Sequence, residues 1–241
     1  MRHQLSVLTL ALLVPMLGSP PVASGSAPAA RPAYSKSVVL DGVSVRLGRH
    51  TAQVVTVNLT RGHHARVTLW AREDGRWVRR LRADDGRIGY GGLVVGTRRR
   101  QGTGTTPLGT YPLPWAFGTH AQRPGWDLRY REIRRGDFWV QDNASDFYNR
   151  YRAKSQGGFR WWLPPSDPNA SERLTDYGRQ YEYSIVVGFN TRQVRHRGSG
   201  IFLHVNGRGA TAGCVSAPRG FLRALMNRLD PQRRPVIAVG R

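Results

Sequence analysis

Short segments that alternate apolar and polar residues fill the chain from Ser37 to Leu93, and they constrain its fold more than any other feature. The segments are VVLDGVSVRL, QVVTVNL, ARVTLWARED and RWVRRLRADDGRIGY, with Asp-Gly pairs at Asp41-Gly42 and Asp74-Gly75. Alternation along a segment is typical of half-buried β-strands, and Asp-Gly favours the tight turn of a hairpin. The spacing predicts a mainly β fold, a sandwich or a barrel, with a hairpin around Asp74-Gly75.

The second half of the chain adds aromatic loops and one helix. From Pro114 to Tyr181 the sequence is rich in Trp, Tyr, Arg and Asp and has no long helical periodicity. Such loops over a β scaffold suit a binding groove for an extended ligand, although single rings also serve to close the core beneath the loops. We expect a strand at 183–189, a helix from Pro218 to Asp230 and a last strand at 235–239.

The N-terminal residues have the pattern of a secretory signal peptide. Arg2 precedes an apolar segment, Leu5 to Leu17, and a tract rich in Pro, Ala, Ser and Gly follows. The pattern predicts a signal peptide at 1–29, a flexible linker at 30–36 and a single domain at 37–241. Because no second long apolar run follows, we expect a protein secreted from the cytoplasm, without an integral membrane segment after cleavage.

Net charge narrows the possible partners. The chain carries a formal net charge of +22, from 37 Lys and Arg against 15 Asp and Glu. Such a charge favours nucleic acid, an anionic envelope polymer or a carboxylate-rich substrate, although it also serves solubility alone. No nucleic-acid-binding module is recognisable, so nucleic acid is not an expected partner.

Cys214 is the only cysteine, so an internal disulfide is excluded, and the thiol is either buried and inert, paired between chains or reactive. It belongs to the stretch GIFLHVNGRGATAGCVS, in which Ile201–Leu203 predicts a buried strand with His204 at its end. A thiol reacts as thiolate and needs a base, which His204 can supply if the loop between them folds back. The amides of Gly213 and Cys214 could then face a developing oxyanion.

No metal or cofactor site is expected. His63 and His64 are adjacent, and we interpret them as turn residues rather than metal ligands. The segment GTRRRQGTGTTPLGTYPL is rich in glycine, but it lacks the Gly-Lys-Ser/Thr ending of a phosphate-binding loop. Its part Thr106–Tyr111 predicts a rigid turn that leads into a strand, in which Pro107 and Gly109 set the backbone dihedrals.

Two of these motifs together resemble a known family. A strand-end histidine followed by a Ser/Thr-X-Gly-Cys turn is similar to the signature of L,D-transpeptidases with a YkuD-type domain, and this chain has His204 and Thr211-Ala212-Gly213-Cys214. Thr106–Tyr111 resembles the family's Thr-Pro-X-Gly-X-aromatic strand entry. The resemblance covers roughly residues 50–241. It implies a YkuD-like β-sandwich or barrel with long aromatic-rich loops and one C-terminal helix after the cysteine.

The resemblance also implies a reaction on peptidoglycan stem peptides. Cys214 would attack the carbonyl of the third residue of a stem tetrapeptide, release D-alanine and form a thioester, while His204 activates the thiol and protonates the leaving amine. An amine from a second stem would then give a 3→3 cross-link. In the family the carbonyl after the histidine orients the imidazole, which assigns that role to Val205, and it places Thr211 and Ser216 at orienting or substrate-binding positions.

Two departures and two alternatives accompany this resemblance. Ala212 stands where many members have His, and Ser216 stands where many have Arg or Asn, so the way in which the substrate carboxylate is held differs here. An L,D-carboxypeptidase of the same family and a non-catalytic basic cell-wall-binding protein are the alternatives. The family further implies a cell-envelope location, a part in peptidoglycan biosynthesis and cell shape, and acylation of Cys214 by carbapenems.

Overall fold

The computed structural model describes residues 34–241 of the chain. The expected signal peptide, residues 1–29, and the first part of the expected linker lie outside the described residues. Strand β1 (Tyr34–Leu40) begins before Ser37, where the sequence predicts the start of the domain. It pairs antiparallel with β2 (Val43–Gly48) in a small two-stranded sheet.

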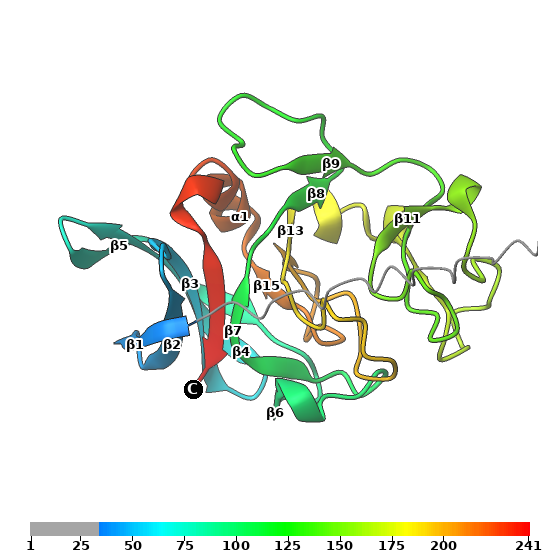
Figure 1. Cartoon of the computed structure of the whole chain (residues 1–241), viewed down its shortest axis with the longest axis horizontal. Coiled ribbons are helices and arrows are strands. Elements are labelled where there is room, and N and C mark those ends of the chain that lie inside the picture. The colour runs from blue at the N-terminus through cyan, green and yellow to red at the C-terminus, as the bar shows by residue number, and fades with distance from the viewer. Residues whose placement is uncertain (1–33) are drawn as a thin grey trace, which may run out of the picture. The chain divides into compact units, whose positions relative to one another are not determined.

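A large mixed sheet forms the body of the domain (Figure 1). Its strands are β3 (Gln53–Arg61), β4 (His64–Glu73), β5 (Arg76–Arg87), β6 (Leu93–Val95), β7 (Thr106–Pro112), β8 (Ala116–Gly118), β9 (Tyr130–Glu132), β13 (Ser184–Val186), β14 (Phe202–Val205), β15 (Val215–Ala217) and β16 (Val236–Gly240). The eleven strands follow the order β6–β7–β16–β3–β4–β5–β15–β14–β13–β8–β9. The predicted mainly β fold is confirmed.

Strands β3, β4 and β5 form an antiparallel meander that matches the alternating segments of the sequence. The turn at Asp74-Gly75 links β4 to β5 with φ angles of 47° and 79°, left-handed values that Asp and Gly tolerate better than other residues. The predicted hairpin is therefore confirmed. One face of β4 lies in the core, since its alternate residues are at most 2% exposed: Ala65, Val67, Leu69 and Ala71.

The predicted helix is confirmed but shorter than expected. Helix α1 (Arg219–Met226) buries its apolar side chains Phe221, Leu222, Leu225 and Met226. It ends before the predicted Asp230 because the backbone leaves helical geometry at Asn227, where ψ is −1°. Asp230 instead caps the 3₁₀ helix Pro231–Arg233, since its side chain accepts a hydrogen bond from the Gln232 amide. Other 3₁₀ turns lie at Gly96–Arg98, Lys154–Gln156, Leu174–Tyr177 and Gln180–Glu182.

Thr106–Tyr111 takes a different structure from the one predicted. The segment is not a turn that precedes a strand but the strand β7 itself, which pairs parallel with β6 and antiparallel with β16. The turn prediction was wrong because the local Pro and Gly signals gave no information about partner strands on both sides. Gly109 does have an unusual dihedral, with φ of +127°.

The aromatic region is organised by a small third sheet. Its strands β10 (Asp137–Trp139), β11 (Tyr151–Ala153) and β12 (Glu172–Arg173) follow the order β11–β10–β12. Trp139 lies in the core at 4% exposure, whereas Trp162 is 62% exposed. No helix within residues 34–241 has the length and apolar character needed to cross a membrane.

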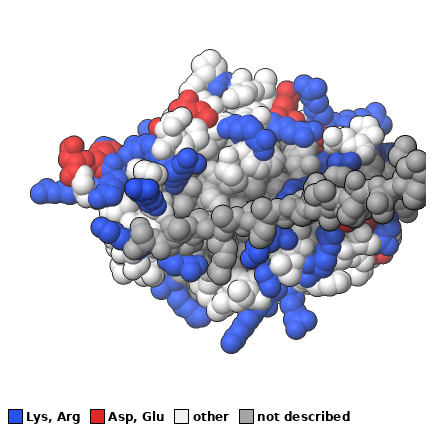
Figure 2. Space-filling view, in the orientation of Figure 1, with Lys and Arg blue, Asp and Glu red and all other residues white. Residues whose placement is uncertain are grey.

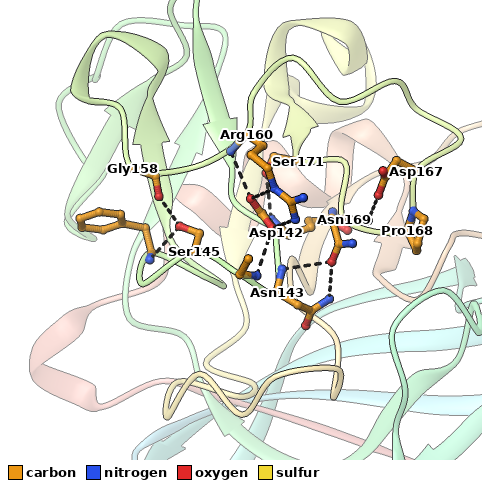
Figure 3. A network of polar contacts seen from close by, with 12 residues as sticks. Asp142, Asn143, Ser145, Gly158, Arg160, Asp167, Pro168, Asn169 and Ser171 are labelled. Atoms are coloured by element: carbon orange, nitrogen blue, oxygen red, sulfur yellow. Dashed lines mark hydrogen bonds and ion pairs between the residues drawn. The ribbon is translucent and has the colours of Figure 1, made fainter.

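Polar contacts connect the loops between these short strands (Figure 3). Asp142 is almost fully buried, and its two carboxylate oxygens accept hydrogen bonds from the Arg160 guanidinium at 2.5 and 2.9 Å. Asn143 Nδ2 donates to Asn169 Oδ1 at 3.0 Å. The proline-rich loop that contains Asn169 is therefore tied to the loop that follows β10.

Candidate active site

A cleft with a volume of about 740 Å³ is lined by residues from loops that are far apart in the sequence. Cys214 and His204 both line it, as do Thr211 and Ala212 from the turn that leads to the cysteine. Further polar and charged side chains in its lining include Arg99, Gln141, Glu172, Tyr177 and Tyr181. The structure therefore brings the histidine and the cysteine indicated by the sequence into one cleft.

Parallel pairing of β14 with β15 sets the positions of these two residues. Leu203 pairs with Val215 and His204 with Ser216, so Cys214 directly precedes β15. Leu203 and Val215 are both 0% exposed, and their burial anchors the two strands in the core. Groups carried by packed strands are held more precisely than groups on loops.

The Cys214 thiol is buried in the resting structure, at 9% exposure. Its Sγ donates a hydrogen bond to the Gly200 carbonyl at 3.2 Å and accepts one from the Phe202 amide at 3.4 Å. Burial raises the pKa of the thiol to about 12, the nearby Glu172 carboxylate acts in the same direction, and the Arg99 guanidinium opposes them. The resting cysteine is therefore a neutral thiol at neutral pH.

The His204 imidazole is buried and oriented by the backbone. Its Nδ1 lies 2.8 Å from the carbonyl oxygen of Val205, and because a carbonyl only accepts, Nδ1 carries the proton and Nε2 is left basic. Burial lowers the pKa of His204 to about 4, so the ring is neutral at pH 7. The Tyr181 ring packs against it with centroids 5.4 Å apart. No hydrogen bond between the imidazole and Sγ occurs among the described contacts of Cys214.

The two sequence motifs meet at the turn before the cysteine. Thr106 Oγ1 accepts from the Gly89 amide and donates to the Gly213 carbonyl, both at 2.8 Å. Thr211 Oγ1 donates to the Cys214 carbonyl at 2.6 Å and accepts from the Gly213 amide at 3.2 Å. The Gly213 amide is thus bound to a hydroxyl in this state, and its role with Cys214 at an oxyanion stays a prediction.

Ser216 lies away from the cleft. It is 0% exposed, and its hydroxyl donates to Asn206 Oδ1 at 2.7 Å. Asn206 in turn donates from Nδ2 to the Asp85 carbonyl at 2.6 Å. Ser216 is therefore part of a contact between β15 and the end of β5, in which its hydroxyl is already used. By contrast, Ala212 is exposed and lines the cleft.

Sequence reasoning missed two charged residues of the cleft, Arg99 and Glu172. Burial raises the pKa of Glu172 to about 7, although its carboxylate accepts hydrogen bonds from the Tyr181 hydroxyl and from Gln141 Nε2. No local pattern distinguishes Arg99 from the other basic residues. Glu172 ends the polar, proline-rich segment LPPSDPNASE, whose composition predicts only a surface loop. Within residues 34–241 no group of three or more His, Cys, Asp or Glu side chains could hold a metal ion.

Comparison with known proteins identifies the family of the chain. A sequence model of the L,D-transpeptidase catalytic domain, YkuD, matches residues 52–237. No curated protein and no solved structure matches the chain. Members of the matched family are cysteine-dependent acyltransferases that act on peptidoglycan peptides in the cell wall. Because the match covers most of the described residues and includes both motifs, the chain belongs to the YkuD family of L,D-transpeptidase catalytic domains.

Proposed function

We propose that this protein is a secreted, cysteine-dependent L,D-transpeptidase that forms 3→3 cross-links between peptidoglycan stem peptides. The observation that carries the proposal is the shared cleft of Cys214 and His204, in which the Val205 carbonyl leaves the imidazole Nε2 free to act as a base. The family match supports the same reaction class. No cofactor or metal takes part in the proposed chemistry.

The reaction proceeds in two acyl-transfer steps. His204 Nε2 takes the thiol proton while Sγ attacks the carbonyl carbon of the third stem residue, and the imidazolium then protonates the leaving nitrogen of D-alanine. The product is a thioester on Cys214. The amine of a second stem attacks the thioester carbonyl, His204 takes a proton from that amine, and the proton returns to sulfur as the C–S bond breaks.

The resting pair is neutral, so the substrate has to change its environment. With the thiol pKa at about 12 and the imidazole pKa at about 4, the ion pair of Cys214 and His204 is disfavoured where the two groups are buried. A bound peptide supplies the carbonyl oxygen on which negative charge develops, so the charge that leaves the thiol does not have to remain on sulfur. Substrate binding therefore precedes proton transfer from Cys214 to His204.

The proposal includes the location and the segments of the chain. Residues 1–29 act as a cleaved signal peptide, residues 30–36 as a linker, and residues 37–241 as the catalytic domain. Many Lys and Arg side chains and few Asp and Glu are visible on the face drawn in Figure 2. Together with the net charge of +22, this supports contact with anionic cell-wall polymers.

Incubation of the purified mature protein with a disaccharide-tetrapeptide, followed by mass spectrometry, tests the proposal. A cross-linked dimer with loss of D-alanine is the expected product. Tripeptide monomer would instead indicate an L,D-carboxypeptidase, and unchanged substrate with binding to sacculi would indicate a non-catalytic cell-wall-binding protein.

Variants and an acylating drug connect the product to the site. Cys214→Ala and His204→Gln should abolish product formation, whereas Arg98→Gln, an exposed change outside the cleft lining, should leave it intact. A carbapenem should add its mass to the wild type and not to Cys214→Ala. Full activity in Cys214→Ala would refute the mechanism.

A further inference from the structure

A buried arginine lies beside the nucleophile without an acidic partner. Arg99 is 6% exposed and lines the same cleft as Cys214. Its Nε donates to the Thr105 carbonyl at 2.7 Å and its Nη1 to the Arg197 carbonyl at 3.3 Å, which are neutral acceptors. Among the ion pairs of residues 34–241, none includes Arg99. A buried cation without a counter-ion is costly, because it loses hydration that neutral carbonyls replace only in part.

Two glycines leave room for the guanidinium. A Cβ at Gly198 would lie 1.5 Å from Arg99 Nη1, and a Cβ at Gly213 would lie 2.7 Å from Arg99 Nη2. Both glycines have positive φ, +96° and +130°. The guanidinium therefore packs against the backbone of the residue that directly precedes the nucleophile, and no larger side chain fits between them.

The carboxylate in the same cleft does not neutralise this cation. Glu172 accepts hydrogen bonds from Tyr181 and Gln141 rather than from Arg99. Burial lowers the pKa of Arg99, and the Cys214 thiol, which opposes this shift only as an anion, is itself kept neutral by burial. The anion that would complete the coordination of Arg99 has therefore to come from the ligand or from the thiolate of Cys214.

The donor peptide supplies an anion at a suitable distance from the reacting atoms. Only an amide nitrogen and a Cα separate the scissile carbonyl carbon from the terminal carboxyl carbon, so these two carbons lie roughly 3–4 Å apart. A carboxylate bound by Arg99 would thus hold the scissile carbonyl close to the turn that carries Cys214. Ser216, whose hydroxyl is bound to Asn206, is not available for this role.

We infer that Arg99 binds the terminal carboxylate of the donor stem peptide and so selects peptides that end in a free D-amino acid. The inference rests on the proposed function. It assigns the leaving residue to the side of the cleft formed by Arg99 and Gly213. A guanidinium forms two parallel hydrogen bonds with a carboxylate, which makes this contact specific for an acid over an amide.

Binding measurements on Cys214→Ala protein test the inference without catalysis. Isothermal titration compares a stem tetrapeptide that ends in D-alanine with the same peptide ending in D-alaninamide. The Cys214→Ala protein with Arg99 unchanged, called here the Arg99-bearing protein, should bind the acid about 10-fold or more tightly than the amide. This ratio is the usual effect of a hydrogen bond to a charged group. Arg99→Gln should remove this preference, Arg99→Lys should keep part of it, and the exposed control Arg98→Gln should keep all of it.

Each alternative gives a different result. Equal affinity of the Arg99-bearing protein for the acid and the amide would overturn the inference while leaving the proposed function intact. A loss of affinity in Arg99→Gln for both peptides, with their ratio unchanged, would show that Arg99 only braces the turn. Binding of neither peptide would refute the proposed function and the inference with it.

The Arg99→Gln variant needs a folding control, which circular dichroism provides. If Arg99→Gln is not folded, the inference is tested with Arg99→Lys and with the Arg99-bearing protein. In that protein free D-alanine should displace the acid peptide at lower concentration than D-alaninamide does. Equal displacement by the two would overturn the inference.

Discussion

Replacement of Thr106 by valine tests the contact that joins the two motifs of the site. The Thr106 side chain is 0% exposed, and its hydroxyl bonds to the Gly89 amide and to the Gly213 carbonyl, both at 2.8 Å. Valine has nearly the same shape but no hydroxyl, so it leaves one buried donor and one buried acceptor without a partner. At about 1–3 kcal/mol for each unsatisfied group, the variant should lose about 3 kcal/mol of unfolding free energy.

Urea unfolding followed by tryptophan fluorescence measures this loss, as a lower midpoint with an unchanged slope. Thr106→Ser keeps the hydroxyl and removes one methyl group, so it should cost about 1 kcal/mol. Thr60→Val is the matched surface control, because the Thr60 hydroxyl donates to the His64 carbonyl at an exposed position, and it should cost less than about 0.5 kcal/mol. A Thr106→Val protein as stable as the Thr60→Val or the Thr106→Ser protein would refute the reasoning.

Three further predictions concern the groups around the thiol. Burial raises the pKa of Cys214 to about 12, so the rate of its alkylation by iodoacetamide should increase with pH up to pH ~9 without a plateau. A plateau below that pH would indicate a preformed ion pair with His204. Gly213→Ala should lose about 1–3 kcal/mol of unfolding free energy, measured with urea, since φ at Gly213 is +130° and the added Cβ would contact the Arg99 guanidinium. Gly209→Ala is the control and should be about as stable as the wild type, because no atom lies within 4 Å of a Cβ added at Gly209. Burial raises the pKa of Glu172 from 4.5 to about 7, so its contribution to stability is full below pH 4.5 and is lost as pH rises through 7. Between these two pH values the wild type should therefore lose more unfolding free energy than Glu172→Gln does. Equal losses would contradict the pKa shift.

Local patterns in the sequence were sufficient for the elements that depend on near neighbours. The Asp74-Gly75 hairpin follows from turn chemistry, and the helix after Pro218 follows from apolar spacing over two turns. The same local signals misplaced the helix end and gave a turn for Thr106–Tyr111. The second error has a clear cause, which is that pairing of β7 with β6 and β16 depends on residues that the local pattern does not contain.

The residues of the candidate active site also fall into two groups, those that the local sequence indicates and those that it does not. His204 and Cys214 are linked by a short loop and a recognisable spacing, so the sequence could indicate that they share a cleft. Arg99 and Glu172 reach that cleft from distant segments, and only the packed sheet brings them there. Ser216 has the right position in the sequence, but its side-chain direction is set by Asn206, which no spacing argument contains.

The position of β16 in the sheet places β7, the strand that begins with Thr106, between segments far apart in the sequence. Within residues 34–241, β7 is hydrogen-bonded in the sheet only to β6 and β16, and β16 links it to β3. Val54 of β3 pairs with Val236 and Gly109 of β7 pairs with Val239, so both pairings join residues far apart in the sequence. Pairings between residues far apart in the sequence form slowly, because the chain loses loop entropy before the contact stabilises it. The part of the sheet that supports the cysteine turn is therefore expected to be completed late in folding.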